Sequence, residues 1–146
     1  MRLIAGAGPN STKQDGIIRI DIIPQWADVV CNIFKEKMPF EDESFEEIEA
    51  SHIMEHCQLN EDFIHTMKEF RRVLKVGGTL YIEVPHKDSP SAYESIEHSR
   101  YFTENSFMNF YENPFAEEMN YPIFKCLDLH CGERGGHKTI CLTLQK

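Results

Sequence analysis

The sequence predicts one α/β domain with a mostly parallel seven-stranded sheet, a C-terminal antiparallel hairpin, and helices mainly on one face of the sheet. Three observations lead to this prediction. Seven short runs rich in branched and aromatic residues alternate apolar and polar positions. Two segments between these runs have a helical period, and only GERGG separates the last two runs. A chain of 146 residues is long enough for one core, so residues 1–146 are assigned to a single domain.

The seven expected strands are short and alternate in polarity. They are residues 2–7, 16–23, 27–33, 46–53, 77–86, 124–131 and 137–145. Tyr81 and Glu83 point to one side of the fifth strand, and Glu47 and Glu49 of the fourth alternate in the same way. A parallel sheet covered on both faces has strands that are apolar throughout. We therefore expect one polar face, open to solvent or to a polar contact that forms a homo-oligomer. Its side chains need no such partner in water.

The helical period is clearest in residues 61–74, where Asn60 is expected to cap the start and Gly77 to follow the end. The apolar residues that share one face of this helix are Phe63, Ile64, Met67, Phe70, Val73 and Leu74. A second helix is expected over residues 103–112, with Thr103 as its N-cap. Both should cover the apolar face, because the linkers PNSTKQDG and PQWA are too short to supply helices for the other.

Charge and hydropathy disfavour two kinds of partner. The formal net charge of −9 would repel a phosphate backbone, and no run of Lys or Arg offsets it, so direct binding to nucleic acid is not expected. No apolar segment approaches the roughly 20 residues of a membrane span. The five cysteines are an odd number, and no leader-like segment opens the chain, so we expect a cytoplasmic protein.

The cysteines and histidines near the C-terminus do not predict a metal site. These residues are Cys126, His130, Cys131, His137 and Cys141. On an extended strand Cys126 and His130 face one side, whereas Cys131 faces the other. We therefore expect no metal there, and no catalytic cysteine, because none neighbours a base with an orienting group.

A glycine turn after the first strand and an acid at the end of the second indicate a nucleotide-containing cofactor. Gly6 and Gly8 permit close backbone approach, and Asp21 ends the run IRID. A nicotinamide cofactor also needs a helix N-terminus for its pyrophosphate, directly after the glycines. Gly8 and Asp21 are only thirteen positions apart, which leaves no room for that helix. The spacing favours a cofactor without a pyrophosphate.

The order of the motifs resembles one family. The glycine turn and Asp21 are followed by ADVVCNIFKEKMPFEDESFEEIEASHIMEH and then by EFRRVLKVGGTLYIEVPH. This arrangement resembles the class I S-adenosylmethionine-dependent methyltransferases, and most closely their short, type 11-like members with reduced helices. The resemblance covers about residues 2–112. It implies a Rossmann-like sheet, S-adenosyl-L-methionine as cofactor, and methyl transfer to a small-molecule or glycan-like acceptor.

The cofactor residues that the resemblance implies lie at the carboxyl ends of the first four strands. They are Gly6, Ala7, Gly8, Asp21, Ile22, Asn32, Ile33, Ala50 and Ser51. Asp21 would accept hydrogen bonds from the ribose hydroxyls, while Asn32 and Ile33 would lie at the adenine. Three positions depart from the common pattern. Ile4 replaces an acid, and Asn10 replaces a third glycine. Asn32 replaces an Asp, but its amide oxygen can still accept a hydrogen bond from the adenine amino group.

Methyl transfer is a displacement at an activated sulfonium, so the protein mainly aligns the reactants and needs a base only when the acceptor loses a proton. The candidate catalytic residues are His86, His52 and Glu55, with His56 beside them. The alternative for Glu55 and His56 is a structural role at the start of the helix. His86 follows a strand end and is expected to have little packing duty.

The segment of residues 86–103 is expected to contact the acceptor as a lid. Its candidate substrate-binding residues are His86, His98, Arg100 and Tyr101. Arg100 would hold a carboxylate or phosphate of the acceptor, or else pair with the protein's own carboxylates. Two other functions stay open from the sequence: a non-catalytic S-adenosylmethionine-binding module, and an enzyme that uses this cofactor for another reaction, such as its breakdown.

Overall fold

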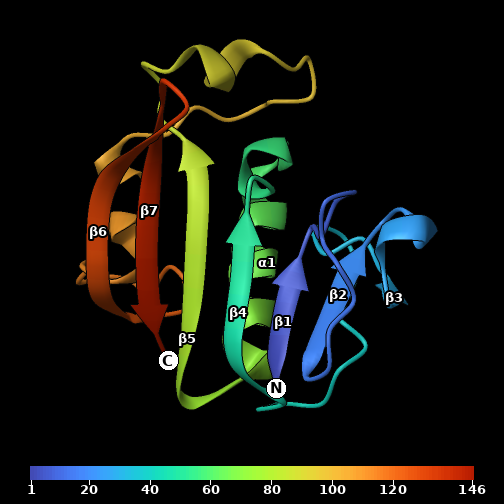
Figure 1. Ribbon diagram of the computed structural model, residues 1–146. Coiled ribbons are helices and arrows are strands. Elements are labelled where there is room, and N and C mark those ends of the chain that lie inside the picture. Colours follow the sequence, from blue (N-terminus) through green and yellow to red (C-terminus); the bar gives the residue numbers. More distant parts are fainter.

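Seven strands form one mixed sheet in the computed structural model, which describes the backbone of residues 1–146 and every side chain except that of Arg134 (Figure 1). The strands are β1 (Arg2–Ala5), β2 (Ile17–Asp21), β3 (Val29–Val30), β4 (Phe45–Ser51), β5 (Leu74–Pro85), β6 (Lys125–Arg134) and β7 (His137–Gln145). Their order is β3-β2-β1-β4-β5-β7-β6. The first five are parallel, and β7 is antiparallel to both β5 and β6. The predicted fold class is confirmed.

The long helix α1 (Asn60–Val73) begins one residue before the prediction and leads directly into β5. Its N-cap is Leu59, so the expectation that Asn60 caps the helix is wrong. The side-chain oxygen of Asn60 instead accepts a hydrogen bond from Arg100 Nη2 at 3.0 Å. The long-range contact with Arg100 takes the group that a local cap would have used.

The other helical segments are short and of the 3₁₀ type. They are η1 (Pro24–Trp26), η2 (Met54–His56), η3 (Pro90–Tyr93) and η4 (Glu104–Phe110). The helix predicted over residues 103–112 corresponds to η4, which is shorter and tighter than expected. Phe107 and Phe110, three residues apart, are its buried residues, and the three-residue turn of a 3₁₀ helix brings such positions to one side. No described helix is long and apolar enough to cross a membrane.

The helices cover one face of the sheet. In Figure 1, α1 lies behind the strands, and the opposite face stands clear in front. Alternate residues of the strands, such as Leu3, Ile48 and Ile82, are fully buried in the core. The core continues into a cluster of four rings in which Phe63 of α1 contacts three others at centroid distances of 5.9–6.2 Å. The alternation of the sequence therefore corresponds to a two-layer domain.

The polar face holds one residue that is more buried than the alternation implies. Glu47 is exposed, and Glu49 and Tyr81 are partly buried, as expected for an uncovered face. Glu83 is buried, however, with 9% of its surface exposed. No helix covers it. Tyr81 donates to its carboxylate at 3.0 Å, and His52 lies 3.6 Å away. Polar neighbours on its own face therefore enclose Glu83.

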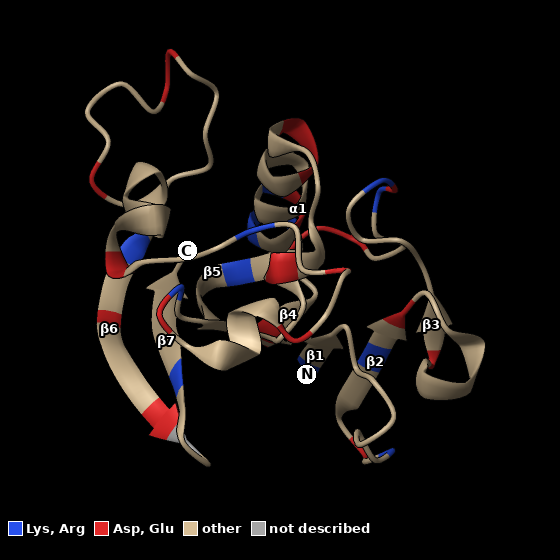
Figure 2. Cartoon of the chain, turned by 90° about the horizontal axis from the view of Figure 1, so that it is seen from above, with Lys and Arg blue, Asp and Glu red and all other residues tan. Residues whose placement is uncertain are grey.

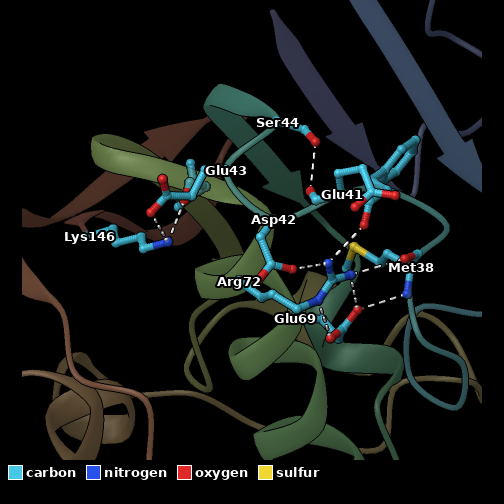
Figure 3. A network of polar contacts seen from close by, with 10 residues as sticks. Met38, Glu41, Asp42, Glu43, Ser44, Glu69, Arg72 and Lys146 are labelled. Atoms are coloured by element: carbon cyan, nitrogen blue, oxygen red, sulfur yellow. Dashed lines mark hydrogen bonds and ion pairs between the residues drawn. The ribbon is translucent and has the colours of Figure 1, made fainter.

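A network around Arg72 fastens the end of α1 to the segment that leads into β4 (Figure 3). The guanidinium donates to both Glu69 oxygens at 2.7 and 2.8 Å, to Asp42 at 2.8 Å, and to the carbonyl of Met38 at 3.0 Å. Glu69 in turn accepts from the Met38 amide at 2.8 Å. These contacts join segments about thirty residues apart.

Candidate functional site

The carboxyl ends of β1, β2 and β3 open into a cavity of about 620 Å³, called the Asp21 cavity below. Figure 2 looks down on these ends, where the acidic end of β2 is red. Six predicted cofactor residues line it: Gly6, Gly8, Asp21, Ile22, Asn32 and Ile33. Pro9, Trp26, Phe34, Ile53, His52, His56, Gln58, Ile96 and Glu97 also line it. Parallel strands that end together therefore gather residues from five segments of the sequence.

Two glycines shape the floor of the cavity in different ways. Both have left-handed backbone conformations, with φ of 67° at Gly6 and 62° at Gly8. A Cβ on Gly6 would lie 2.7 Å from the Ile53 side chain, so close packing excludes one. A Cβ on Gly8 would meet nothing closer than the Gly6 carbonyl at 4.0 Å. Gly6 is thus required for packing, whereas Gly8 leaves space on the cavity side.

Asp21 is buried, with 8% of its surface exposed, and its carboxylate is only partly satisfied by the protein. Oδ2 accepts a hydrogen bond from the Gly8 amide at 3.1 Å, and Oδ1 accepts one from the Ile23 amide at 2.9 Å. A carboxylate has about four acceptor positions. The glycine turn therefore orients Asp21 while leaving acceptor capacity for a ligand in the cavity.

Asn32 and its neighbours form the wall opposite the glycine turn. The side-chain oxygen of Asn32 accepts from the Phe34 amide at 3.1 Å, so the oxygen expected to meet adenine already has one partner. The exposed side chain of Ile22 and the only tryptophan, Trp26, also line the cavity. The sequence analysis missed Trp26. The available signal was its position two residues after the Ile-Ile-Pro run that follows β2.

Three predicted cofactor residues do not line the Asp21 cavity. Ala50 is fully buried in the core, because β4 packs between β1 and β5. Ser51 points to the polar face, where its hydroxyl lies 3.4 Å from Glu83 Oε2. Ala7 sits in the glycine turn and contributes only a weak backbone contact to the Ile20 carbonyl at 3.4 Å. Side-chain contact of Ala50 or Ser51 with a ligand in this cavity is therefore not supported.

His52 stands between the cavity and the polar face. Its backbone is left-handed, with φ of 53°. Nδ1 lies 3.4 Å from Glu55 Oε1, and Nε2 lies 3.6 Å from Glu83 Oε1. Interaction with Glu55 raises the pKa of His52, burial opposes this, and the charges of Glu55 and Glu83 raise it further. The net upward shift favours the imidazolium form, which suits an anion-stabilising role better than that of a general base.

His86 lies outside the cavity and is buried, so the expectation that it has little packing duty is wrong. Its Nδ1 accepts a hydrogen bond from the Asp88 amide at 3.1 Å. Its Nε2 lies 3.3 Å from both Glu104 Oε2 and Lys138 Nζ. The Cys131 thiol donates to Glu104 Oε1 at 2.8 Å, and this bond is the main reason that the pKa of Glu104 falls to about 2.

The predicted substrate-binding residues His98, Arg100 and Tyr101 contact other protein groups and so attach the lid, residues 86–103, to the rest of the chain. Arg100 donates through Nε to the Cys57 carbonyl at 2.6 Å and lies over the Phe63 ring, 4.9 Å from its centroid. It contacts none of the described carboxylates, so the expected pairing with the protein's own acids is wrong. Tyr101 is half-exposed and stacks on Tyr93 at 4.8 Å. His98 packs edge-on against His56, with ring centroids 4.9 Å apart.

Comparison with known proteins identifies a related family and related folds. A family model described as a methyltransferase domain matches residues 12–82, which include Asp21 and the SHIMEH segment but not the glycine turn. The demethylmenaquinone methyltransferases of Chlorobaculum tepidum and Chlorobaculum parvum are each 48% identical over 52 residues. Those residues are 36% of this chain and only 20% of each relative.

Solved structures of methyltransferases match 99% of this chain, and three of them illustrate the likeness. The 1,6-didemethyltoxoflavin-N1-methyltransferase of Burkholderia thailandensis, solved with S-adenosylhomocysteine, has a TM-score of 0.67, 17% identity and 70% of its own length covered. A methyltransferase from Methanosarcina mazei has a TM-score of 0.69, 15% identity and 92% covered. One from Archaeoglobus fulgidus has a TM-score of 0.68, 13% identity and 85% covered. At such identities the likeness establishes the fold alone.

Proposed function

We propose that the chain is a class I S-adenosylmethionine-dependent methyltransferase, which binds S-adenosyl-L-methionine in the Asp21 cavity and methylates a small-molecule acceptor. The observation that carries the proposal is the partly satisfied carboxylate of Asp21. Two vicinal ribose hydroxyls are donors that match its remaining acceptor positions. The nearby glycine turn offers backbone without side-chain obstruction at Gly8.

The size and lining of the cavity suit this cofactor. Its volume of about 620 Å³ lies within the range of ligand sites, which is roughly 300–1,000 Å³. Trp26, Ile22 and Ile33 supply apolar and aromatic surface for a base, next to the polar group of Asp21. The opposite end is lined by His52, His56 and Glu97, where the acceptor would approach.

The chain's residues would mainly orient the reactants. The bound cofactor supplies a methyl group on an already activated sulfonium. Asp21 and the glycine turn fix the ribose, and His52 lies at the acceptor end with a pKa that the neighbouring carboxylates raise. An imidazolium there stabilises an anionic acceptor, so acceptors that carry their negative charge before reaction are favoured. Alignment of this kind is worth up to about 7–11 kcal/mol in favourable reactions.

A non-catalytic cofactor-binding function is the second candidate, favoured by the placement of two expected acceptor-binding residues. His86 is buried among Asp88, Glu104 and Lys138, and Arg100 is engaged by the Cys57 carbonyl and Asn60. Neither points to an acceptor in the Asp21 cavity. The two candidates share the cofactor site and differ only in turnover.

Calorimetry with S-adenosylmethionine, followed by mass spectrometry of the cofactor with and without cell extract, tests both candidates. Asp21→Asn should weaken binding by about 1.5–3 kcal/mol, the range for a hydrogen bond to a charged group. Asp15→Asn, an exposed acid in the loop before β2, is the matched control and should bind like the unaltered chain. Binding with methyl transfer supports the enzyme, and binding without turnover supports the second candidate. Breakdown of the cofactor without an acceptor would point to a different reaction.

A further inference from the structure

Glu55, His56 and His98 form a cluster at the acceptor end of the Asp21 cavity. One ligand atom of each residue lies within 4.8 Å of those of the other two. His56 lines the cavity, as does Glu97, the neighbour of His98. We propose that these three residues bind one divalent transition-metal cation.

The carboxylate of Glu55 is the first reason for this assignment. Glu55 is 1% exposed, and neither of its oxygens makes a hydrogen bond to any described group. His52 Nδ1 lies 3.4 Å from Oε1, close enough for an ion pair but outside hydrogen-bond geometry, and Oε2 has no partner among the described residues. Burying a carboxylate without hydrogen bonds, and with only one oxygen near a charged neighbour, is costly, and buried charges are normally paired or coordinate a metal. A cation beside Glu55 would remove this cost.

The imidazole of His98 is the second reason. Its Nδ1 lies 3.2 Å from the carbonyl oxygen of Ala92, a buried residue. A carbonyl only accepts, so Nδ1 must carry the proton and donate it, which leaves the lone pair on Nε2. Metal-binding histidines almost always donate their other ring N–H in this way, because the bond fixes the tautomer and the ring orientation. His98 therefore already has the outer hydrogen bond of a metal ligand.

Backbone contacts join the two segments that supply the ligands. The amides of Ser99 and Arg100 both donate to the Glu55 carbonyl, at 2.8 and 3.2 Å. Arg100 also donates to the Cys57 carbonyl. The lid residue His98 is thus held beside η2 without a metal, so a cation would meet ligands that are already assembled.

A second cluster, formed by His86, Glu104 and Cys131, has comparable geometry, but its members are already hydrogen-bonded to one another. Lys138 Nζ lies 3.3 Å from His86 Nε2 and 3.8 Å from Glu104 Oε1. The Cys131 thiol already donates to Glu104. A cation would have to displace an ammonium group there, and the members satisfy one another without it. This cluster therefore serves as an internal control rather than a site.

Two imidazole nitrogens and one carboxylate suit borderline cations such as Zn²⁺, Co²⁺ or Fe²⁺ better than Mg²⁺ or Ca²⁺, which prefer oxygen ligands. Three protein ligands leave at least one coordination position open. If the proposed methyltransferase function holds, that position faces the acceptor. An acceptor hydroxyl bound there would have its pKa lowered by the cation. Binding of the metal itself does not depend on that function.

The experiment titrates the full chain, prepared without a histidine tag and treated with chelator, with Zn²⁺ alone by calorimetry and with Co²⁺ alone by absorption. We expect one equivalent to bind, with a Co²⁺ spectrum that lacks a thiolate charge-transfer band. Glu55→Gln and His98→Asn should each lower affinity at least about tenfold, since even outer-shell changes cost 10–100-fold. Cys131→Ser should bind as tightly as the unaltered chain.

Glu55→Gln also distinguishes a true loss of metal binding from a loss caused by unfolding of the variant. Without metal, this nearly isosteric change removes a buried charge, so the melting temperature should stay the same or rise, while stabilisation by Zn²⁺ is lost. No binding, or binding that persists in Glu55→Gln and His98→Asn, would overturn the proposal. A chain that binds Zn²⁺ but not S-adenosylmethionine would keep this site and overturn the proposed function.

Discussion

Three glycines in and near the glycine turn share a backbone conformation but differ in what surrounds them. Gly6, Gly8 and Gly16 all have positive φ, between 62° and 78°. A Cβ would clash with Ile53 at Gly6, would meet only the Gly6 carbonyl at 4.0 Å at Gly8, which lines the cavity, and would meet nothing within 4 Å at Gly16. The three positions therefore form a matched set in which only the surroundings differ.

We expect Gly8→Ala and Gly16→Ala to lose similar stability, about 1–2 kcal/mol each, because both force Ala into a left-handed conformation. Only Gly8→Ala should weaken S-adenosylmethionine binding, since its methyl group enters the cavity side of the turn. Gly6→Ala should lose the most stability because strain and the clash with Ile53 add. Denaturant unfolding and calorimetry provide the two measurements. Equal cofactor affinity in Gly8→Ala and Gly16→Ala would argue against ligand contact at Gly8.

His86 shows how burial changes the role expected of a residue. Its ring contacts Asp88, Glu104 and Lys138, and it lies outside the Asp21 cavity. We expect His86→Ala to lower the free energy of unfolding by about 1–3 kcal/mol, because it leaves buried polar partners unsatisfied. Cofactor affinity, measured by calorimetry, should not change. A loss of affinity without a loss of stability would restore a role for His86 at the site.

At the scale of elements, the Arg72 network decides how α1 is joined to the sheet. Arg72 bridges Glu69, Asp42 and the Met38 carbonyl. We expect Arg72→Ala to destabilise the fold by about 3 kcal/mol, the lower end for removing one partner of a buried pair, because the network keeps some contact with water. Arg72→Lys, which keeps the charge but loses the planar fork, should lose less. Equal losses in both variants would show that only the fork geometry matters.

The same network predicts a pH dependence. Burial raises the pKa of Glu69, but hydrogen bonds from Arg72 and the Met38 amide outweigh burial, so the net pKa lies below the usual 4.5. A carboxyl whose folded pKa is depressed contributes stability above its unfolded pKa and loses it as the pH falls through the folded pKa. Unfolding measured from pH 6 downward should therefore show a steeper loss below about pH 4.5 in the unaltered chain than in Glu69→Gln. If stability fell with pH in the same way in both proteins, Glu69 would not be the source of the acid sensitivity.

At the scale of the whole molecule, the uncovered face of the sheet is lined by polar side chains. A groove on this face is lined by Arg2, Glu47, Glu49, Thr79, Tyr81 and Glu83, and Arg2 pairs with Glu49 within one chain. Tyr81 likewise donates to Glu83, and Glu47 is exposed to water, so neither needs a second copy. We therefore expect sedimentation to show folded monomers at low concentration and any association to weaken with salt, since screening acts on exposed charges. A dimer that resists high salt would require an apolar contact elsewhere.

The layers of this protein and the meeting of the glycine turn with Asp21 could be predicted from the sequence. Alternation along the strands corresponds to one covered and one open face because neighbouring side chains of a strand must point in opposite directions. The short span between Gly8 and Asp21 brings the turn and the acid together, since parallel strands joined by a short loop end side by side. These outcomes follow from local geometry, which depends on residues that are close together in the sequence.

Only the tertiary structure decided which distant groups meet. It enclosed Glu83 on an otherwise open face, placed His86 beside Lys138, and turned Arg100 toward Cys57. It also brought His98 to Glu55, in a chain whose sequence predicted no metal site. Burial and pairing depend on segments about thirty or more residues apart, whose relative placement is fixed by packing of the complete core. Patterns of neighbouring residues therefore cannot predict that placement.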